Sequence, residues 1–107
     1  MLALDWGELR LGSIIQMPIL VAIHRLKDFD EWIKLFKTNP PPQVGRWRLT
    51  RGVDDRNRVH VVAELQPSEV QGVKDFIESE HMKDVFRRVN AMSTAPLEFI
   101  WLEEVAP

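Results

Sequence analysis

Two stretches of this chain are apolar on both sides of an extended backbone, which limits its folds more than any other feature. Five consecutive apolar residues run from Ile19 to Ile23, inside the β-favouring stretch 18–26. Residues 97–105 (LEFIWLEEV) place Leu97, Phe99 and Trp101 on one side and Ile100 and Leu102 on the other. A strand with one face in water alternates apolar and polar residues. Both strands are therefore expected to be covered on both faces.

Between these strands, apolar residues recur at the i, i+3, i+4 and i+7 spacing of amphipathic helices. They are Phe29, Trp32, Ile33 and Phe36 in one segment and Met82, Val85, Phe86 and Val89 in another. Asp28 is the expected N-cap of the first helix, with Glu31 completing a capping-box pattern. Ser68 is the expected cap of a second helix, which restarts at Ser79. Residues 45–65 read as two strands joined by a polar turn near residues 54–57.

The resulting order is β-α-β-β-α-β. It predicts an α+β ferredoxin-like sandwich, in which a four-stranded antiparallel sheet carries its helices on one face. The other face would expose the apolar side chains of the first and last strands, and so large an apolar patch is unusual on a soluble monomer. We therefore expect a second copy of the chain to cover it, giving a homodimer through the sheet faces that forms a dimeric α/β barrel.

Length and composition describe one globular domain and exclude several classes of function. The chain has 107 residues, 45% hydrophobic and 28% charged, with a net charge of -2 that gives no general attraction to nucleic acid or anionic lipid. It has no cysteine, which excludes disulfides, thiolate nucleophiles and cysteine-based metal sites.

The N-terminal stretch is treated separately from the domain. Residues 1–16 lack a basic start and are interrupted by charges, so they do not resemble a signal peptide, and no stretch of the chain is long enough to span a membrane. We expect no membrane partner and a cytoplasmic location. We expect residues 1–16 to be a peripheral extension and residues 17–107 to be the domain. The alternative is an ordinary arm that packs Leu9, Leu11 and Ile14 on the body.

Several segments, together with the element order, resemble dimeric α/β-barrel proteins. These segments are residues 28–32 (DFDEW), 53–59 (VDDRNRV), 76–80 (FIESE) and 96–98 (PLE). That superfamily includes antibiotic-biosynthesis-type monooxygenases, polyketide cyclases and haem-degrading enzymes. The resemblance covers about residues 18–105 and is architectural. It implies two sheets that form a barrel, and in each subunit a cavity between the sheet and the helices or loops that can bind a small apolar molecule.

The haem-degrading chemistry of that superfamily does not carry over to this chain. Such members place an asparagine before Arg-Leu at the end of the first strand, where this chain has His24. They also pair a tryptophan with a histidine on the second helical segment. His81 fits that histidine, but no tryptophan lies between Trp47 and Trp101. We therefore expect no cofactor.

His24, His60 and Arg48 are the candidate catalytic residues. Both histidines lie on strands at the opposite parity to the bulkier apolar residues, so both are expected to point into the barrel. A neutral imidazole there can act as a base toward an acidic carbon or a phenol, with Arg48 stabilising the resulting anion. The commoner arrangement is a histidine hydrogen-bonded in a half-buried interface. Glu64 and Trp101 are candidate substrate-binding residues.

Other chemistries lack their motifs. No histidine has H-x-H or H-E-x-x-H spacing, so we expect no metal, and the chain has no G-x-S-x-G, P-loop or G-x-G-x-x-G motif. RNA-binding RRM domains share the fold, and five arginines fall between Arg46 and Arg58. However, residues 58–65 lack the aromatics and the glycine through which an RRM reads bases, so we expect no nucleic-acid partner.

Two functions remain. One is a cofactor-independent monooxygenase-like or cyclase-like enzyme that acts on a small apolar or aromatic molecule. The other is a non-catalytic ligand-binding or assembly module. A closed apolar pocket into which polar groups converge favours the enzyme, and a solid interface with paired polar groups favours the module.

The hairpin register decides which polar groups can meet. A loop with an odd number of residues places Trp47 and Leu49 on the face of residues 59, 61 and 63. Arg46, Arg48, His60 and Glu64 then gather on the opposite face. An even loop separates His60 and Glu64 from Arg48. We expect the odd register.

Overall fold

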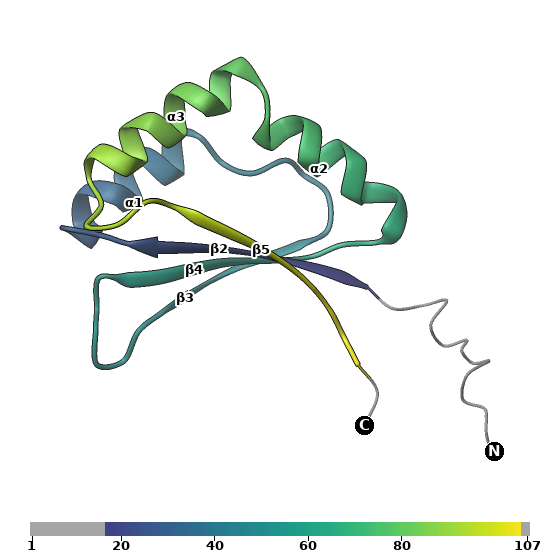
Figure 1. Cartoon of the computed structure of the whole chain (residues 1–107), viewed down its shortest axis with the longest axis horizontal. Coiled ribbons are helices and arrows are strands. Elements are labelled where there is room, and N and C mark those ends of the chain that lie inside the picture. Colours follow the sequence, from purple (N-terminus) through teal and green to yellow (C-terminus); the bar gives the residue numbers. More distant parts are fainter. Residues whose placement is uncertain (1–16, 106–107) are drawn as a thin grey trace.

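The structure is a computed structural model that describes residues 17–105, and the expected peripheral extension, residues 1–16, lies outside them. Figure 1 shows one layer of helices over one sheet. Its elements are β2 (Pro18–Arg25), α1 (Phe29–Thr38), β3 (Arg46–Arg51), β4 (Arg58–Glu64), a short 3-10 turn (Pro67–Glu69), α2 (Val70–Ile77), α3 (Glu80–Ala91) and β5 (Glu98–Glu103). The predicted element order is confirmed, with the second helical segment divided into α2 and α3 as the restart at Ser79 indicated.

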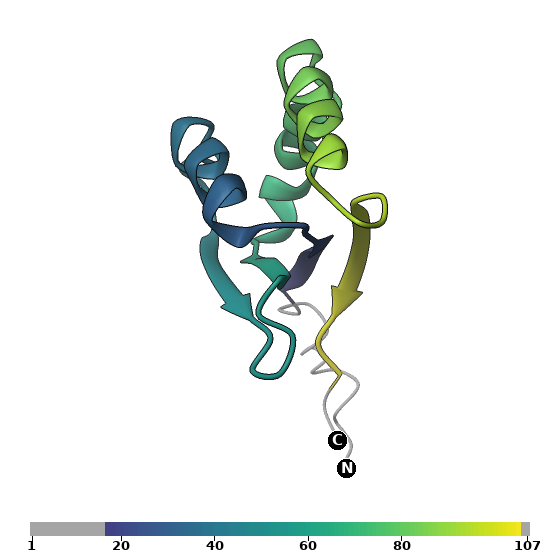
Figure 2. The same ribbon diagram turned by 90° about the vertical axis from the view of Figure 1, so that its left-hand side faces the viewer.

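The four strands form one antiparallel sheet in the order β3-β4-β2-β5. Seen along the strands in Figure 2, α1 lies over the β3 side of the sheet and α3 over the β5 side. The other face of the sheet is not covered by any of residues 17–105 (Figure 1). The predicted α+β ferredoxin-like sandwich is therefore confirmed.

Helix starts follow local capping chemistry, with two corrections to the sequence analysis. Glu31 does not complete a capping box at α1, because its carboxylate pairs with Lys34 at 3.4 Å. The Asp28 carboxylate accepts a hydrogen bond from the backbone N–H of Asp30, and the Ser79 hydroxyl accepts one from that of Met82 at the start of α3. Ser68 was the wrong cap for the second helix. A 3-10 turn precedes α2, and Gln66 and Glu69 close it as a capping box, because Pro67 suits the first position of that turn.

The hairpin has the odd register. Trp47 pairs with Ala63 and Leu49 with Val61, so these side chains share the helix-facing side of the sheet, because residues directly opposite each other in a ladder point the same way. Leu20, Ala22 and His24 of β2 lie on the same side. With Trp32, Val73, Val85 and neighbouring residues they form the core between the sheet and the helices.

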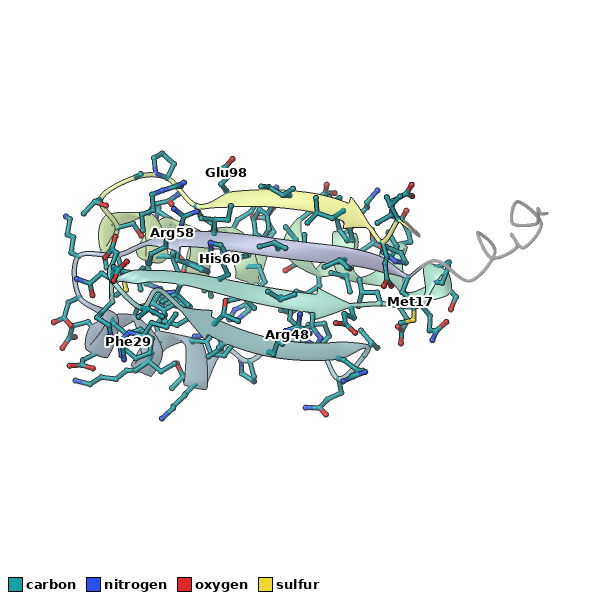
Figure 3. The ribbon with its side chains drawn as sticks, turned by 90° about the horizontal axis from the view of Figure 1, so that it is seen from below. Met17, Phe29, Arg48, Arg58, His60 and Glu98 are labelled. Atoms are coloured by element: carbon teal, nitrogen blue, oxygen red, sulfur yellow. The ribbon has the colours of Figure 1, made fainter. Side chains whose placement is uncertain are left out.

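The opposite side of the sheet, here called the open face, is apolar along β2 and β5 and polar along β3 and at the end near Arg58 (Figure 3). Its apolar side chains are Ile19, Val21, Ile23, Val62, Ile100 and Leu102, and its polar ones are Arg25, Arg46, Arg48, Thr50, Arg58, His60, Glu64 and Glu98. Ile23 and Val62 are buried by their neighbours alone, whereas Leu102 is 48% exposed. The expectation that β2 and β5 carry apolar residues on both faces is confirmed.

Candidate functional site

A cavity of about 70 Å³ lies between the sheet and the helices. Its walls come from β2, β3, β4 and β5 below and from α1, α2 and α3 above, and they are almost entirely apolar. Aromatic rings make up much of the lining, namely those of Trp32, Phe36, Trp47, Phe76, Phe86 and Phe99. His24 and Asn39 are the lining residues with polar side chains. The site therefore offers an apolar surface with very few hydrogen-bonding groups.

His24 is the buried polar group of this cavity. Its side of β2 faces the helices, and the residue is only 5% exposed. The imidazole packs on Trp32 with 4.8 Å between ring centroids, and Trp32 in turn stacks on Phe36 at 5.1 Å. Within residues 17–105 the Nδ1 atom has no hydrogen-bond partner. An unpaired polar atom in a protein interior typically costs about 1–3 kcal/mol, so this atom calls for an explanation.

Burial keeps the imidazole of His24 uncharged. Desolvation lowers the pKa of His24 to about 4, and repulsion from His60 adds to the effect. A neutral imidazole carries one N–H donor and one acceptor nitrogen. At neutral pH His24 can therefore donate a hydrogen bond or accept one.

The far end of the cavity lies where α1 ends and α3 begins. Asn39, which follows α1 and lines the cavity, places its Oδ1 atom 3.0 Å from Nε2 of His81 on α3. The Nδ2 atom of Asn39 donates to the carbonyl of Leu35 at 3.1 Å. The Asn39–His81 contact thus joins two helices that line opposite walls of the cavity.

His60 and Arg48 lie on the other side of the sheet from His24 (Figure 3). Nε of Arg58 donates to Nε2 of His60 at 3.2 Å. Desolvation, followed by the charges of Arg58 and Arg25, lowers the pKa of His60. The expectation that both histidines point into the barrel is wrong for His24. It pairs with Val59 and faces the helices, whereas His60 pairs with Ile23 and lies on the open face, because adjacent positions of a strand face opposite ways.

Glu64 is the ion-pair partner of the arginines on β3. Nη1 of Arg48 lies 2.7 Å from one carboxylate oxygen of Glu64, and Nη1 of Arg46 lies 3.8 Å from the other. The hydrogen bond from Arg48 lowers the pKa of Glu64, with the charges of both arginines adding to it. The register therefore gathers Arg46, Arg48 and Glu64 into one polar group at an edge of the open face.

Trp101 faces the helix side of the sheet near the end of β5, where it pairs with Leu20. It is 37% exposed, and the ammonium of Lys74 lies 5.5 Å from its ring centroid. Trp101 is not among the residues that line the cavity. Of the five candidate site residues, only His24 lies in the cavity.

The residue that sequence reasoning missed is Trp32. It is 1% exposed and forms the wall against which His24 packs. In the sequence Trp32 belongs to a stripe of apolar residues at helical spacing. Residues in such a stripe are usually core residues, so the pattern did not mark Trp32 as part of a site. The available signal was the number of aromatic side chains on one face of α1, because Phe29, Trp32 and Phe36 follow one another there.

Comparison with known proteins identifies the fold. No protein-family model and no curated protein matches the chain. Among solved structures, a protein described as an antibiotic biosynthesis monooxygenase is 17% identical, with a TM-score of 0.61, and the match covers 84% of this chain and all 100% of that one. A conserved protein from Methanosarcina mazei Go1 is 15% identical, with a TM-score of 0.63 and coverage of 87% and 96%. Protein SO0527 from Shewanella oneidensis is 14% identical, with a TM-score of 0.65 and coverage of 83% and 91%.

These likenesses confirm the resemblance to antibiotic-biosynthesis-monooxygenase-like proteins at the level of the fold. The matches span nearly the whole length of each structure, so the shared unit is a complete ferredoxin-like domain. No helix within residues 17–105 is long and apolar enough to cross a membrane.

Proposed function

We propose that this protein binds a small apolar or aromatic molecule in the cavity between the sheet and the helices, and that it acts on it as a monooxygenase-like or cyclase-like enzyme. The observation that carries the proposal is the Nδ1 atom of His24, which is buried without a partner in an aromatic cavity. A bound molecule with one hydrogen-bonding group would satisfy this atom and leave the rest of its surface in apolar contact. The fold shared with a monooxygenase supports the class of reaction.

His24 is the residue we assign to the chemistry. A neutral imidazole can remove the proton of a phenol or of an acidic carbon, and the resulting electron-rich ring can react with dioxygen. For 1-naphthol, the balanced reaction takes up one O₂, places one oxygen atom on the ring to give a quinone, and releases the other as water with the two hydrogens lost. Arg48 is left out of this scheme because it lies on the opposite side of the sheet.

The size of the cavity adds a requirement. An apolar cavity of about 150 Å³ is enough to hold benzene, whereas this one measures about 70 Å³. A ring-sized ligand therefore needs the walls to move apart. The Asn39–His81 contact is the hydrogen bond that joins α1 to α3 at this cavity, so we expect it to break when a ligand of that size enters.

Binding is tested with phenol and with toluene, which has nearly the same shape but no hydroxyl group. A ligand of the folded state raises the midpoint of thermal unfolding. We expect phenol to raise it more than toluene does at the same concentration, and we expect His24→Leu to abolish the difference. Lys83→Gln, an exposed residue of α3 outside the cavity, is the control substitution and should keep the difference. An equal response to both probes, or an unchanged phenol response in His24→Leu, would contradict the proposal.

An assay for turnover distinguishes the enzyme from the non-catalytic ligand-binding module. Oxygen uptake and quinone absorbance are measured with 1-naphthol under air, with and without the protein. Uptake of one O₂ per quinone, lost in His24→Leu and retained in Lys83→Gln, supports the enzyme. Binding of phenol without any turnover would instead support the non-catalytic ligand-binding module.

We further propose that two copies assemble through the open face. The observation that favours an assembly role is the apolar patch along β2 and β5, which is bordered by polar side chains on β3 and at one end of the sheet, as an interface core is bordered by a polar rim. The partner is a second copy because ion pairs within the chain, Arg48 with Glu64 and Arg25 with Glu98, already balance part of the charge beside the apolar residues. The open face of one copy can therefore pack against the open face of a second copy related to it by two-fold symmetry.

A further inference from the structure

We propose that the cationic corner of the open face, formed by Arg25, Thr50, Arg58 and His60, binds a small oxyanion of the phosphate or carboxylate class. This inference goes beyond the proposed function, because the corner lies on the side of the sheet opposite the His24 cavity. All four side chains come from one chain, and they lie beside the apolar residues through which two copies are proposed to meet, at the polar rim that an interface leaves open to solvent. Figure 3 shows Arg58 and His60 toward one end of the open face.

The register brings these side chains together. Arg25 pairs directly with Arg58, and Thr50 pairs directly with His60 on the adjoining row of the sheet. Cross-strand partners lie about 5 Å apart, so Thr50 lies beside His60 and Arg25 lies beside Arg58. A pocket of about 230 Å³ opens there, lined by Thr50, Arg51, Gly52, Arg58 and His60. The pocket has room for a tetrahedral anion and its water.

Charge at the corner is positive and largely unbalanced. The open face carries four arginines against two glutamates, and Glu64 is already held by Arg46 and Arg48 at the other end of the sheet. Glu98 lies 3.4 Å from Arg25 in an exposed pair. Among residues 17–105, no carboxylate lies within 4.0 Å of Arg58. The guanidinium of Arg58 therefore keeps donors available, and its planar fork matches an oxyanion.

The neighbours of Arg51 explain why it is not counted as a ligand. Its guanidinium carbon lies 3.8 Å from the ring centroid of Phe29, and its Nε donates to the carbonyl of Arg56 at 2.5 Å. Arg51 belongs to the helix-facing side through its pairing with Val59. It contributes to the wall of the pocket, while Arg58, His60 and Thr50 supply the donors.

His60 supplies a hydrogen-bond donor to the proposed site, and its pKa can report whether an anion is bound. Because its Nε2 accepts from Nε of Arg58, the neutral ring carries its proton on Nδ1, which is left as a donor. The charged groups around it are Arg58 on β4, Arg25 on β2 and Glu98 on β5, and Thr50 faces it from β3. Desolvation, followed by the charges of Arg58 and Arg25, lowers the pKa of His60, and an anion beside the arginines would oppose their part of that effect by stabilising the imidazolium.

The test is a pH titration of the full chain followed through the imidazole signals in NMR spectra, at constant ionic strength, in sodium chloride alone and with added phosphate. The chain has three histidines, so His24 and His81 serve as internal references. We expect phosphate to raise the pKa of His60 and to shift its signals saturably, while those of His81 stay in place. A parallel, non-saturating change of His60 and His81 would overturn the proposal.

Variants locate the site. Arg58→Gln should lose the saturable response, and Arg88→Gln on α3, an exposed arginine that pairs with Asp84, should keep it. A response in Arg58→Gln equal to that of the natural chain would overturn the assignment, and circular dichroism confirms that each variant is folded. Acetate replaces phosphate in a second arm. Saturation by both anions supports an oxyanion site that accepts carboxylates, and saturation by phosphate alone supports one that is specific for the dianion.

Discussion

His24 is a titratable side chain in an apolar place, and its burial ties the stability of the fold to pH. In the unfolded chain a histidine has a pKa near 6.5, whereas burial lowers the pKa of His24 to about 4 in the folded protein. Between these values the unfolded chain binds the extra proton and the folded chain does not. Stability is therefore complete above pH 6.5 and falls as the pH drops toward 4.

This difference predicts a measurable loss of stability in acid. A shift of this size corresponds to roughly 3 kcal/mol of unfolding free energy between pH 7 and pH 4. Urea unfolding followed at several pH values should show that decline in the natural chain. His24→Leu should flatten much of it, and His81→Gln should not. A His24→Leu variant with the same pH dependence as the natural chain would show that His24 is not the group responsible.

At the same scale, the sequence placed His24 and His60 correctly on strands but could not say which side each faces. The sequence shows which residues of a strand share a side, because side chains alternate, but which of the two sides the helices cover is decided only by packing. Trp32 illustrates the same limit. An aromatic residue in an amphipathic stripe is expected to be buried, yet its contact with His24 joins a helix to a strand and has no sequence signature.

At the scale of elements, the side chain of Asn57 in the hairpin turn forms a hydrogen bond at the start of the first helix. Oδ1 of Asn57 accepts the backbone N–H of Phe29 at 3.0 Å, at the first residue of α1. Nδ2 of Asn57 donates to the carbonyl of Lys27 at 3.4 Å, and the backbone of Leu26 donates to the Asn57 carbonyl at 2.9 Å. The β3–β4 turn thus binds the first N–H of a helix that lies 28 residues before it in the sequence.

We expect Asn57→Ala to lower the unfolding free energy by about 1–2 kcal/mol, because it leaves the N–H of Phe29 without its partner. Denaturant unfolding measures the change. Asp54→Ala, an exposed residue of the same turn, is the control and should change stability by less than about 0.5 kcal/mol. Equal losses in the two variants would mean that the Asn57 side chain does not hold the junction.

The elements themselves were predictable because each follows from local spacing. Apolar residues at i, i+3, i+4 and i+7 give α1 and α3, and alternation across a polar turn gives β3 and β4. The failure at Ser68 is also local in origin. Gln66 and Glu69 close the preceding turn reciprocally, so the chain enters α2 through a 3-10 turn and a hydroxyl cap is not needed.

At the scale of the whole molecule, the proposed dimer is tested at the open face. Leu102 is 48% exposed at the edge of that face, so Leu102→Glu should leave the fold intact and place a charge in the interface. Sedimentation velocity should show a dimer for the natural chain and weaker association for the variant. Val53→Glu changes an 85% exposed residue at the tip of the hairpin and should associate like the natural chain. A natural chain that sediments as a monomer would contradict the proposal.

The sequence by itself determined the order of elements, the ferredoxin-like fold and the two-sided apolar character of β2 and β5, because these depend on residue spacing along the chain. Only the tertiary structure decided that His24 lines a cavity while His60, Arg48 and Glu64 lie on the open face. The reason is physical: adjacent side chains of a strand point to opposite sides, and which side becomes the interior depends on where the helices pack. Helix packing is a contact between distant segments, and no local pattern encodes it.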